Sequence, residues 1–390
     1  ACFRRQRPPN GKSGLKTIMV ENSLGRLWLE SHPESDVGVK WNYYLPPVEQ
    51  DTLVQQQLDS LKKPCLPPED ITVMDPACGS GHILVYAFDV LYQIYEERGY
   101  LRDDIPALIL RNNLFGLEID DRAAQLASFV LVMKARSKSP TIFQKEVVPN
   151  ILSIQESNNL EQSTAYNLMD ESVKEIVDEL IDFYKDAKNY GSILKPHILN
   201  LDQLQAELPS LTEYDDEGAS LSRFEALIRQ TELLSRKYDV VITNPPYMYA
   251  RNMNAELSAY LRKHYRDSKA DLFAAFLERS ITMTKDGGAV GTIKQHSWMF
   301  LSSYERLRVR LLETKIIQSL LHLGAGAFEE IGGEVVQSTA FVLRNTQCPE
   351  FKGEYYRLID GDNSDEKREL FLNGGQKYIK RNTNFRTIPG

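Results

Sequence analysis

The chain has 390 residues, of which 42% are hydrophobic and 26% charged, and its net charge is −8. This composition is that of an ordinary globular protein, and the length allows one large domain or two of average size. No apolar run reaches the roughly 20 residues of a membrane-spanning helix, and the basic, polar start lacks the apolar segment of a secretory signal. The four cysteines are too widely spaced for a disulfide framework or a zinc site. We therefore expect a cytoplasmic protein that binds neither a metal nor a membrane.

Residues 1–70 are predicted to form an N-terminal segment of helices and irregular chain. Apolar residues recur at helical spacing from Val20 to Glu30, and a second helical piece is predicted near Leu53 to Leu61. From residue 71 onward, strands and helices alternate. This alternation predicts an α/β fold, with a parallel sheet covered by helices.

The alternating part is predicted to consist of two halves separated by an insertion. Residues 158–237 interrupt the alternation, and their apolar residues recur at helical spacing opposite an acidic face, which predicts a helical insertion. Residues 346–390 are predicted to begin a C-terminal extension. The first half, 71–157, has predicted strands at 71–74, 114–119 and 150–154 and helices at 81–98 and 122–134; the second half, 238–345, has strands at 238–243, 289–293, 316–323 and 338–344, helices at 272–283 and 304–313, and a turn at 285–288.

A glycine-rich turn, DPACGSGH at residues 75–82, follows the first predicted strand. Glycines let a ligand approach the backbone closely, and the N-terminus of the following helix offers free N–H groups. Neither the dinucleotide pattern GxGxxG nor a Walker lysine is present, and the acid Asp75 suits a cationic or polar ligand better than a pyrophosphate. The second strand ends in Glu118, at the place where an acid accepts hydrogen bonds from ribose hydroxyls. Together these features predict a nucleoside ligand without phosphates, whereas singly they are also compatible with a tight turn and a solvated acid.

The predicted strand at 238–243 ends abruptly in Asn244-Pro245-Pro246-Tyr247. Two prolines remove two backbone donors and fix two φ angles, and the residue before each proline is held extended. The segment is therefore rigid and non-helical. It indicates a site that needs a fixed amide, free carbonyls and an aromatic ring at the end of a strand.

The order DPACGSG, GLEID and NPPY resembles the amino-group DNA methyltransferases that use S-adenosylmethionine, in the group that methylates N6 of adenine. The similarity runs from about Val20 to the C-terminus and includes DLFAAFLERSI (271–281), KDGGAVGTI (285–293) and HLGAGAFEEIGGEVVQSTAFVLR (322–344). The sequence is most similar to the BREX/Pgl phage-resistance methyltransferases and to type II restriction–modification methyltransferases. The resemblance implies a Rossmann-like S-adenosylmethionine-dependent methyltransferase sheet with helices on both faces and a helical insertion.

The resemblance also implies the catalytic residues. The side-chain oxygen of Asn244 and the carbonyl of Pro245 would accept the two amino protons of adenine N6, and Pro246 would help to hold this geometry. The ring of Tyr247 would stack on the base after it is flipped out of the duplex. Phe328 would flank the base on the other side, with a role in the core as the alternative.

On the cofactor side, the resemblance places Asp75, Ala77 and Gly79 around the methionine part. Pro76 and Gly81 of the same turn are also predicted to bind the cofactor. Glu118 would hold the ribose hydroxyls, Ile119 would pack on the adenine, and Gln155 or Glu156 would read its amino group. Gly191-Ser192 is a further candidate, although a plain loop is the favoured interpretation.

A basic cluster follows NPPY and includes Arg251, Arg262, Lys263 and Arg266. A local basic face, and not the net charge, decides whether a protein binds nucleic acid. We therefore expect double-stranded DNA as a partner, with a solvated charged face as the alternative. The resemblance adds protein partners from a defence system.

Two features differ from the family, and they keep other functions open. GKSGLKTIM replaces the family's Tyr-Thr-Pro-like helix start, and no target-recognition region is visible, so we expect a fragment of a longer product. The altered N-terminus favours an inactive scaffold that binds DNA or partner proteins. The third hypothesis is a protein glutamine methyltransferase, against which the long spacing from Asp75 to Asn244 and the insertion count.

Overall fold

The computed structural model describes residues 14–160, 166, 167, 169–197, 201–207, 209, 219–326 and 337–387. The chain divides into two compact units, one of residues 67–288 and one that combines residues 1–66 with 289–390. The boundary between the two units falls after Gly288, inside the predicted catalytic half. The predicted domain limits stay a prediction. Among the described residues, no helix is both long and apolar enough to cross a membrane.

The unit of residues 67–288 is built on four parallel strands in the order β3-β2-β1-β4. Because β1 is parallel to both of its neighbours, β2 and β4, the carboxyl ends of these three strands lie along one edge of the sheet. The strands are β1 (Val73–Asp75), β2 (Leu114–Glu118), β3 (Asn150–Ser153) and β4 (Tyr238–Thr243), and β5 (Thr284–Gln295) begins in this unit and continues in the other.

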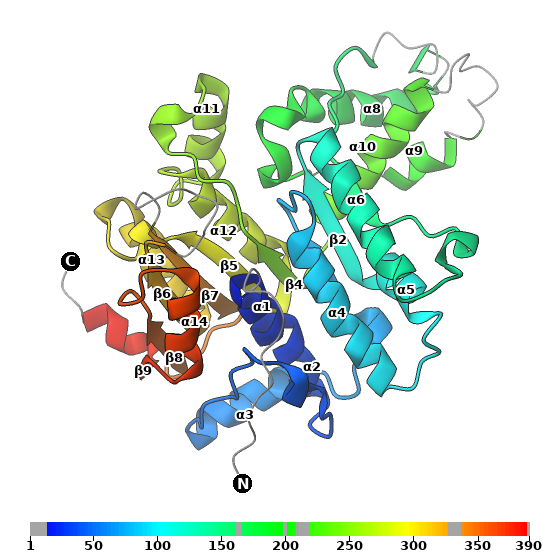
Figure 1. Ribbon diagram of the computed structural model, residues 1–390. Helices are drawn as coiled ribbons and strands as arrows, with labels where there is room; N and C mark the ends of the chain where they lie inside the picture. Colours follow the sequence, from blue (N-terminus) through cyan, green and yellow to red (C-terminus); the bar gives the residue numbers. More distant parts are fainter. Residues whose placement is uncertain are drawn as a thin grey trace. The chain divides into compact units, whose positions relative to one another are not determined.

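Helices cover both faces of this sheet (Figure 1). On one face, α4 (His82–Glu97) contacts β1 and β2, and α6 (Asp121–Arg136) contacts β2 and β3. On the other face, Met74, Phe115 and Val241 belong to one core with the insertion helices α8 (Glu171–Tyr184) and α10 (Ala219–Ser235). The predicted α/β fold, with helices on both faces and a helical insertion, is therefore confirmed.

The remaining helical elements of this unit are short or follow the prolines. Two longer helices, α11 and α12, come after β4. The bounds are α5 (Ile105–Leu108) with a π turn (Ile109–Asn113), α9 (Leu201–Glu207), α11 (Ala255–His264), α12 (Leu272–Met283), and 3-10 turns at Pro68–Asp70, Ile142–Lys145, Ala187–Asn189, Gly191–Ile193 and Ala250–Asn252.

The other unit carries the strands in the order β5-β7-β6-β8-β9. β7 is antiparallel to β5 and β6, whereas β8 is parallel to β6 and antiparallel to β9. Its strands are β6 (Ile316–Gly324), β7 (Ser338–Arg344), β8 (Lys352–Arg357) and β9 (Gln376–Arg381), and its helices are α1 (Gly14–Val20), a π turn (Glu21–Gly25), α2 (Arg26–Ser31), α3 (Thr52–Leu61), α13 (Glu305–Thr314) and α14 (Ser364–Leu372), with 3-10 turns at Val37–Lys40, His296–Met299, Ser302–Tyr304 and Asn382–Thr387.

One predicted element is wrong. The sequence predicts a turn at 285–288, but these residues belong to β5, and Gly287 has a φ of 71°. A Cβ atom on Gly288 would meet the Asp239 carbonyl oxygen at 2.5 Å. The two glycines therefore allow a strand to pass close to β4, where the sequence pattern is typical of a turn.

Candidate active site

The glycine-rich turn leaves the end of β1 and is tied to β2. The Cys78 N–H donates to the Leu117 carbonyl at 3.0 Å, and the Gly79 N–H donates to Glu118 Oε2 at 2.8 Å. Asp75 Oδ1 accepts a hydrogen bond from the Ala77 N–H at 3.1 Å. The structure therefore brings Asp75, the turn and Glu118 together, as the order of the strands predicts.

The two glycines of the turn differ in what surrounds them. Gly79 and Gly81 have φ angles of 53° and 79°, a region that side chains rarely adopt. A Cβ atom on Gly81 would meet Ala127 Cβ at 3.1 Å, so this glycine lets α4 pack against α6. A Cβ atom on Gly79 would meet nothing within 4 Å. The backbone at Gly79 is therefore open to an approaching ligand.

Backbone donors fix the carboxylate of Glu118. Besides the Gly79 N–H, the N–H groups of Ile119 and Asp120 donate to Oε1 at 2.9 and 3.2 Å. A carboxylate accepts about four hydrogen bonds, so capacity for another donor remains. The side chain is half-buried at the edge of the sheet, which suits an acceptor for a ligand hydroxyl.

The carboxyl of Asp75 is buried in the turn. Burial raises its pKa to about 7, and the charge of Glu118 adds to this effect, whereas the hydrogen bond from the Ala77 N–H opposes it. This carboxyl therefore changes its charge near neutral pH. A cation beside it would favour the ionised form.

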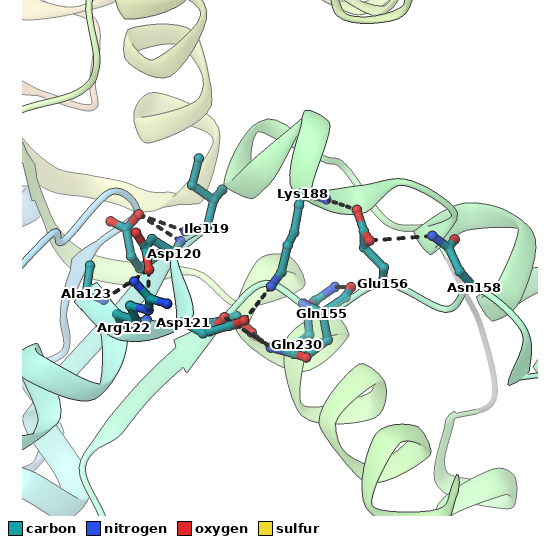
Figure 2. A network of polar contacts seen from close by, with 12 residues as sticks. Ile119, Asp120, Asp121, Arg122, Ala123, Gln155, Glu156, Asn158, Lys188 and Gln230 are labelled. Carbon is teal, nitrogen blue, oxygen red and sulfur yellow. Dashed lines mark hydrogen bonds and ion pairs between the residues drawn. The ribbon is translucent and has the colours of Figure 1, made fainter. Parts of the chain in front are cut away.

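Gln155 and Glu156, the candidates for reading adenine, belong to a polar network that joins β3 to the insertion (Figure 2). The Gln155 N–H donates to Gln230 Oε1 at 2.6 Å, and Gln155 Nε2 donates to Asp121 Oδ1 at 3.3 Å. Glu156 Oε1 accepts from the Lys188 N–H at 3.2 Å, and Lys188 Nζ pairs with Asp121 Oδ2 at 2.7 Å. Contact of either residue with adenine stays a prediction.

Gly191-Ser192 lies against the predicted cofactor residues. The Ser192 hydroxyl donates to the carbonyl of Pro76 in the glycine-rich turn. Gly191 has a φ of 61°, and a Cβ atom there would meet Ile119 Cγ2 at 2.8 Å. The sequence favours a plain loop here, because the YGSIL segment follows β3 by nearly forty residues and only the packing of the insertion places it beside the turn.

Asn244 and Tyr247 project from the end of β4. Asn244 is exposed and the next residue, Pro245, is buried, so the side-chain amide of Asn244 faces solvent from a rigid stretch of backbone. The Tyr247 hydroxyl donates to Asn244 Oδ1 at 3.3 Å, and burial raises the pKa of Tyr247, so the hydroxyl remains a donor. The Tyr247 ring meets Phe273 edge-to-face at 6.1 Å between centroids.

The residues after the prolines are clamped to the start of α12. The Met248 N–H donates to Asp271 Oδ1 at 3.0 Å, and the Met248 carbonyl accepts from the Leu272 N–H at 3.0 Å. Asp271 also caps α12, because the same oxygen accepts from the Phe273 N–H at 3.2 Å. NPPY is thus held at both ends.

The pairing of β1 with β4 brings the two motifs to the same edge of the sheet. Met74 pairs with Val241, so Asp75 and Asn244 both lie at the carboxyl ends of adjacent strands. Glu118 ends β2 on the other side of β1. Phe328, the predicted second aromatic, lies outside the described residues.

The basic cluster surrounds α11. This helix buries Leu257 and Leu261 in one core with Ile193 of the insertion, so its opposite face is turned to solvent. The four predicted DNA-binding residues are all exposed: Arg251, Arg262, Lys263 and Arg266.

A parallel sheet with a glycine-rich turn after β1, an acid at the end of β2 and NPPY after β4 defines a Rossmann-like α/β methyltransferase. The Eco57I restriction-modification methylase family matches residues 112–328, more than half of the chain. The chain belongs to this family.

Two curated relatives match 95% of the chain. The chain is 40% identical over 401 residues to the adenine-specific methyltransferase BrxX of Escherichia coli O9:H4 (strain HS), and 38% identical over 397 residues to the adenine-specific methyltransferase PglX of Lacticaseibacillus casei (strain Zhang). It spans 33% and 32% of the lengths of these two relatives.

Solved structures share the fold at low sequence identity. The Type ISP restriction-modification enzyme LlaGI, solved with a DNA substrate mimic, matches 98% of this chain over 27% of its own length, with 15% identity and a TM-score of 0.52. A DrdV–DNA complex matches 96% of this chain over 30% of its own length, with 13% identity and a TM-score of 0.52.

Proposed function

We propose that this chain transfers a methyl group from S-adenosylmethionine to N6 of an adenine flipped out of double-stranded DNA, in a phage-defence or restriction–modification system. The observation that carries the proposal is the meeting of the glycine-rich turn, Glu118 and NPPY along one edge of one sheet, within one compact unit. The relatives BrxX and PglX are both named adenine-specific methyltransferases, which supports the choice of base.

The residues at this edge fit S-adenosylmethionine. The open space over Gly79 admits a ligand to the backbone, and Glu118 offers an acceptor to ribose hydroxyls. Ile119 is 49% exposed, a large apolar surface next to that acid on which an adenine ring can pack. Asp75 supplies negative charge near the cationic methionine end. When bound, the cofactor supplies a methyl group already activated on a sulfonium sulfur.

The side chain of Asn244 prepares the nucleophile. The lone pair of adenine N6 is delocalised into the ring, and hydrogen bonds accepted from both amino protons make it more available. Asn244 Oδ1 and the Pro245 carbonyl would accept these two protons. The hydrogen bond from the Tyr247 hydroxyl holds the Asn244 amide with its oxygen in a defined position. After transfer, one N6 proton leaves through these acceptors to solvent.

DNA must deliver its base to this edge from outside the duplex, because the N6 group is buried in a base pair. Stacking on the Tyr247 ring would offset the unstacking by about 1–3 kcal/mol, and Phe328 is our proposed second ring. The exposed cations around α11 would contact the phosphates and steer the duplex.

The decisive experiment compares two variants of the full chain. Asn244→Ala should abolish transfer of label from S-adenosylmethionine to phage DNA, while calorimetric binding of the cofactor stays within about twofold of the parent. Glu118→Ala should lose cofactor binding itself. Label in protein glutamines in place of DNA would favour the glutamine methyltransferase. Binding of DNA or a partner protein by a parent chain that does not bind the cofactor would favour the scaffold.

A further inference from the structure

Residues 187–195, AKNYGSILK, form a segment of the insertion that we call the bridge segment. On one side it contacts the proposed cofactor site: the Ser192 hydroxyl donates to the Pro76 carbonyl, and Gly191 packs on Ile119 so closely that a Cβ atom would approach to 2.8 Å. Lys188 pairs with Asp121, one residue beyond the cap of α6. The bridge segment therefore lies directly against the residues proposed to hold the cofactor.

The other side of the bridge segment contacts α11. Asn189 Oδ1 accepts a hydrogen bond from Asn254 Nδ2 at 2.7 Å. Asn254 is the N-cap of α11, where its own oxygen accepts from the Leu257 N–H at 2.9 Å. The Tyr190 ring lies 4.9 Å from the ring of Tyr260 on the same helix. The helix that carries the basic cluster is thus seated on the bridge segment.

A shared core joins the two sides. Ile193 is fully buried, and its carbonyl accepts a hydrogen bond from the Tyr265 hydroxyl just beyond α11. Ala77 of the glycine-rich turn and Met248 of the segment after NPPY pack against the same core. Close-packed groups transmit displacement, because they have little free volume in which to absorb it.

Arg279 of α12 anchors the bridge segment from below. Its Nε donates to the Ser192 carbonyl at 2.9 Å, and its Nη2 donates to the Leu234 carbonyl at 2.6 Å. The side chain is only 5% exposed. Burying a cation costs free energy unless it is hydrogen-bonded, and Arg279 uses this buried charge to bind two carbonyls. This indicates that the position of Ser192 is closely held.

We propose that the bridge segment positions α11 from the cofactor site, so that a bound cofactor orders the helix whose cations face the DNA. This inference rests on the proposed function, since it needs a nucleoside ligand against Ile119 and the glycine-rich turn. A ligand there would press on Gly191 and the Pro76–Ser192 hydrogen bond. Asn189 and Tyr190 would pass this restraint on to α11, and so couple the cofactor site to the DNA-facing helix.

The test is amide hydrogen exchange of the full chain with and without saturating S-adenosylhomocysteine, after calorimetry has shown that each protein binds it. Ser192→Ala removes the contact on the turn side. Asn189→Ala combined with Tyr190→Leu removes the contacts on the helix side and keeps an apolar side chain. Glu171→Ala is the matched control, because this insertion residue has a side chain 91% exposed on α8.

In the parent and in Glu171→Ala, the ligand should slow exchange both in residues 187–195 and in Ala255–His264. In the helix-side variant, the ligand should still slow exchange in residues 187–195, but its slowing of exchange in α11 should be at least about fivefold smaller than in the parent, the range of a typical coupling between sites. In Ser192→Ala, the ligand at equal saturation should no longer slow exchange in α11. Undiminished slowing of α11 in both variants, or none in the parent, overturns the inference. A parent that does not bind the ligand at all refutes the proposed function itself, and calorimetry reveals this before exchange is measured.

Discussion

Gly79 and Gly81 provide a matched pair of sites for testing whether a ligand occupies the glycine-rich turn. Both have positive φ, so an alanine at either position costs about 1–2 kcal/mol of folding free energy for the left-handed backbone. At Gly81 the new Cβ would also meet Ala127 Cβ at 3.1 Å and Cα at 3.2 Å. Overpacking of this kind adds about 1–3 kcal/mol, so Gly81→Ala should be the more destabilising change.

Cofactor binding should rank the two variants in the opposite order. The Cβ atom of Gly79→Ala would project into the open space that we assign to the cofactor. A steric conflict of about 1–3 kcal/mol there corresponds to a loss of affinity of about 5- to 150-fold. Gly81→Ala points its Cβ atom at α6, and its folded fraction should bind the cofactor much more like the parent.

Thermal unfolding and calorimetric titration with S-adenosylmethionine measure the two quantities separately. For a unit of this size, 1 kcal/mol shifts Tm by about 2–4 °C, so Gly79→Ala should lower Tm by about 2–8 °C. Parent-like cofactor affinity in Gly79→Ala, at a temperature where it is folded, would refute the idea that the ligand approaches the backbone at this turn.

Three further predictions concern charge and stacking. Because the pKa of Asp75 is raised to about 7, the folded protein keeps the Asp75 carboxyl protonated from about pH 4 to 7, whereas the unfolded chain does not, so the free energy of unfolding should fall as pH rises through this range. With this pKa the carboxyl is about one tenth ionised at pH 6 and about three quarters ionised at pH 7.5, so cofactor affinity should rise up to about eightfold between pH 6 and pH 7.5. Asp75→Asn should flatten this rise in calorimetric titrations, and an unchanged rise would assign it to another group. Neutralising Arg262, Lys263 and Arg266 should reduce the steepness with which log affinity for duplex DNA falls against log salt by up to about 3, measured by fluorescence anisotropy. An unaltered slope would make the cluster a solvated face. Tyr247→Phe removes the hydrogen bond to the active-site amide but keeps the ring, so its rate of methyl transfer should stay within about tenfold of the parent, whereas Tyr247→Ala should lose about 5- to 150-fold with the stacking energy. Equal rates of methyl transfer in the two variants would refute the proposal that the Tyr247 ring stacks on the flipped base.

Local patterns predicted the elements beside the motifs well. The limits of β4, α12 and β7 agree with the sequence, and two of these elements have a strong local signal at one limit. β4 ends where the prolines begin, and Asp271 caps α12. Such signals act within a few residues, so they are visible without the fold.

Elements that depend on distant packing were harder to predict. The KDGG stretch is typical of a turn, yet the neighbouring β4 leaves room only for glycine at Gly288 and makes it part of a strand. Residues 352–381 add β8, α14 and β9 to the second unit, although the sequence predicts there only the start of an extension.

By itself, the sequence determined the class of site: an acid and glycines after one strand, an acid after the next, and a rigid amide with an aromatic ring after a third. Residue types and their spacing suffice for this, because parallel strands present their carboxyl ends at one edge. Only the tertiary structure decided what surrounds the site. It seats Gly191 and Ser192 behind the glycine-rich turn and α11 on the bridge segment, since contacts between residues more than forty positions apart depend on how the insertion packs.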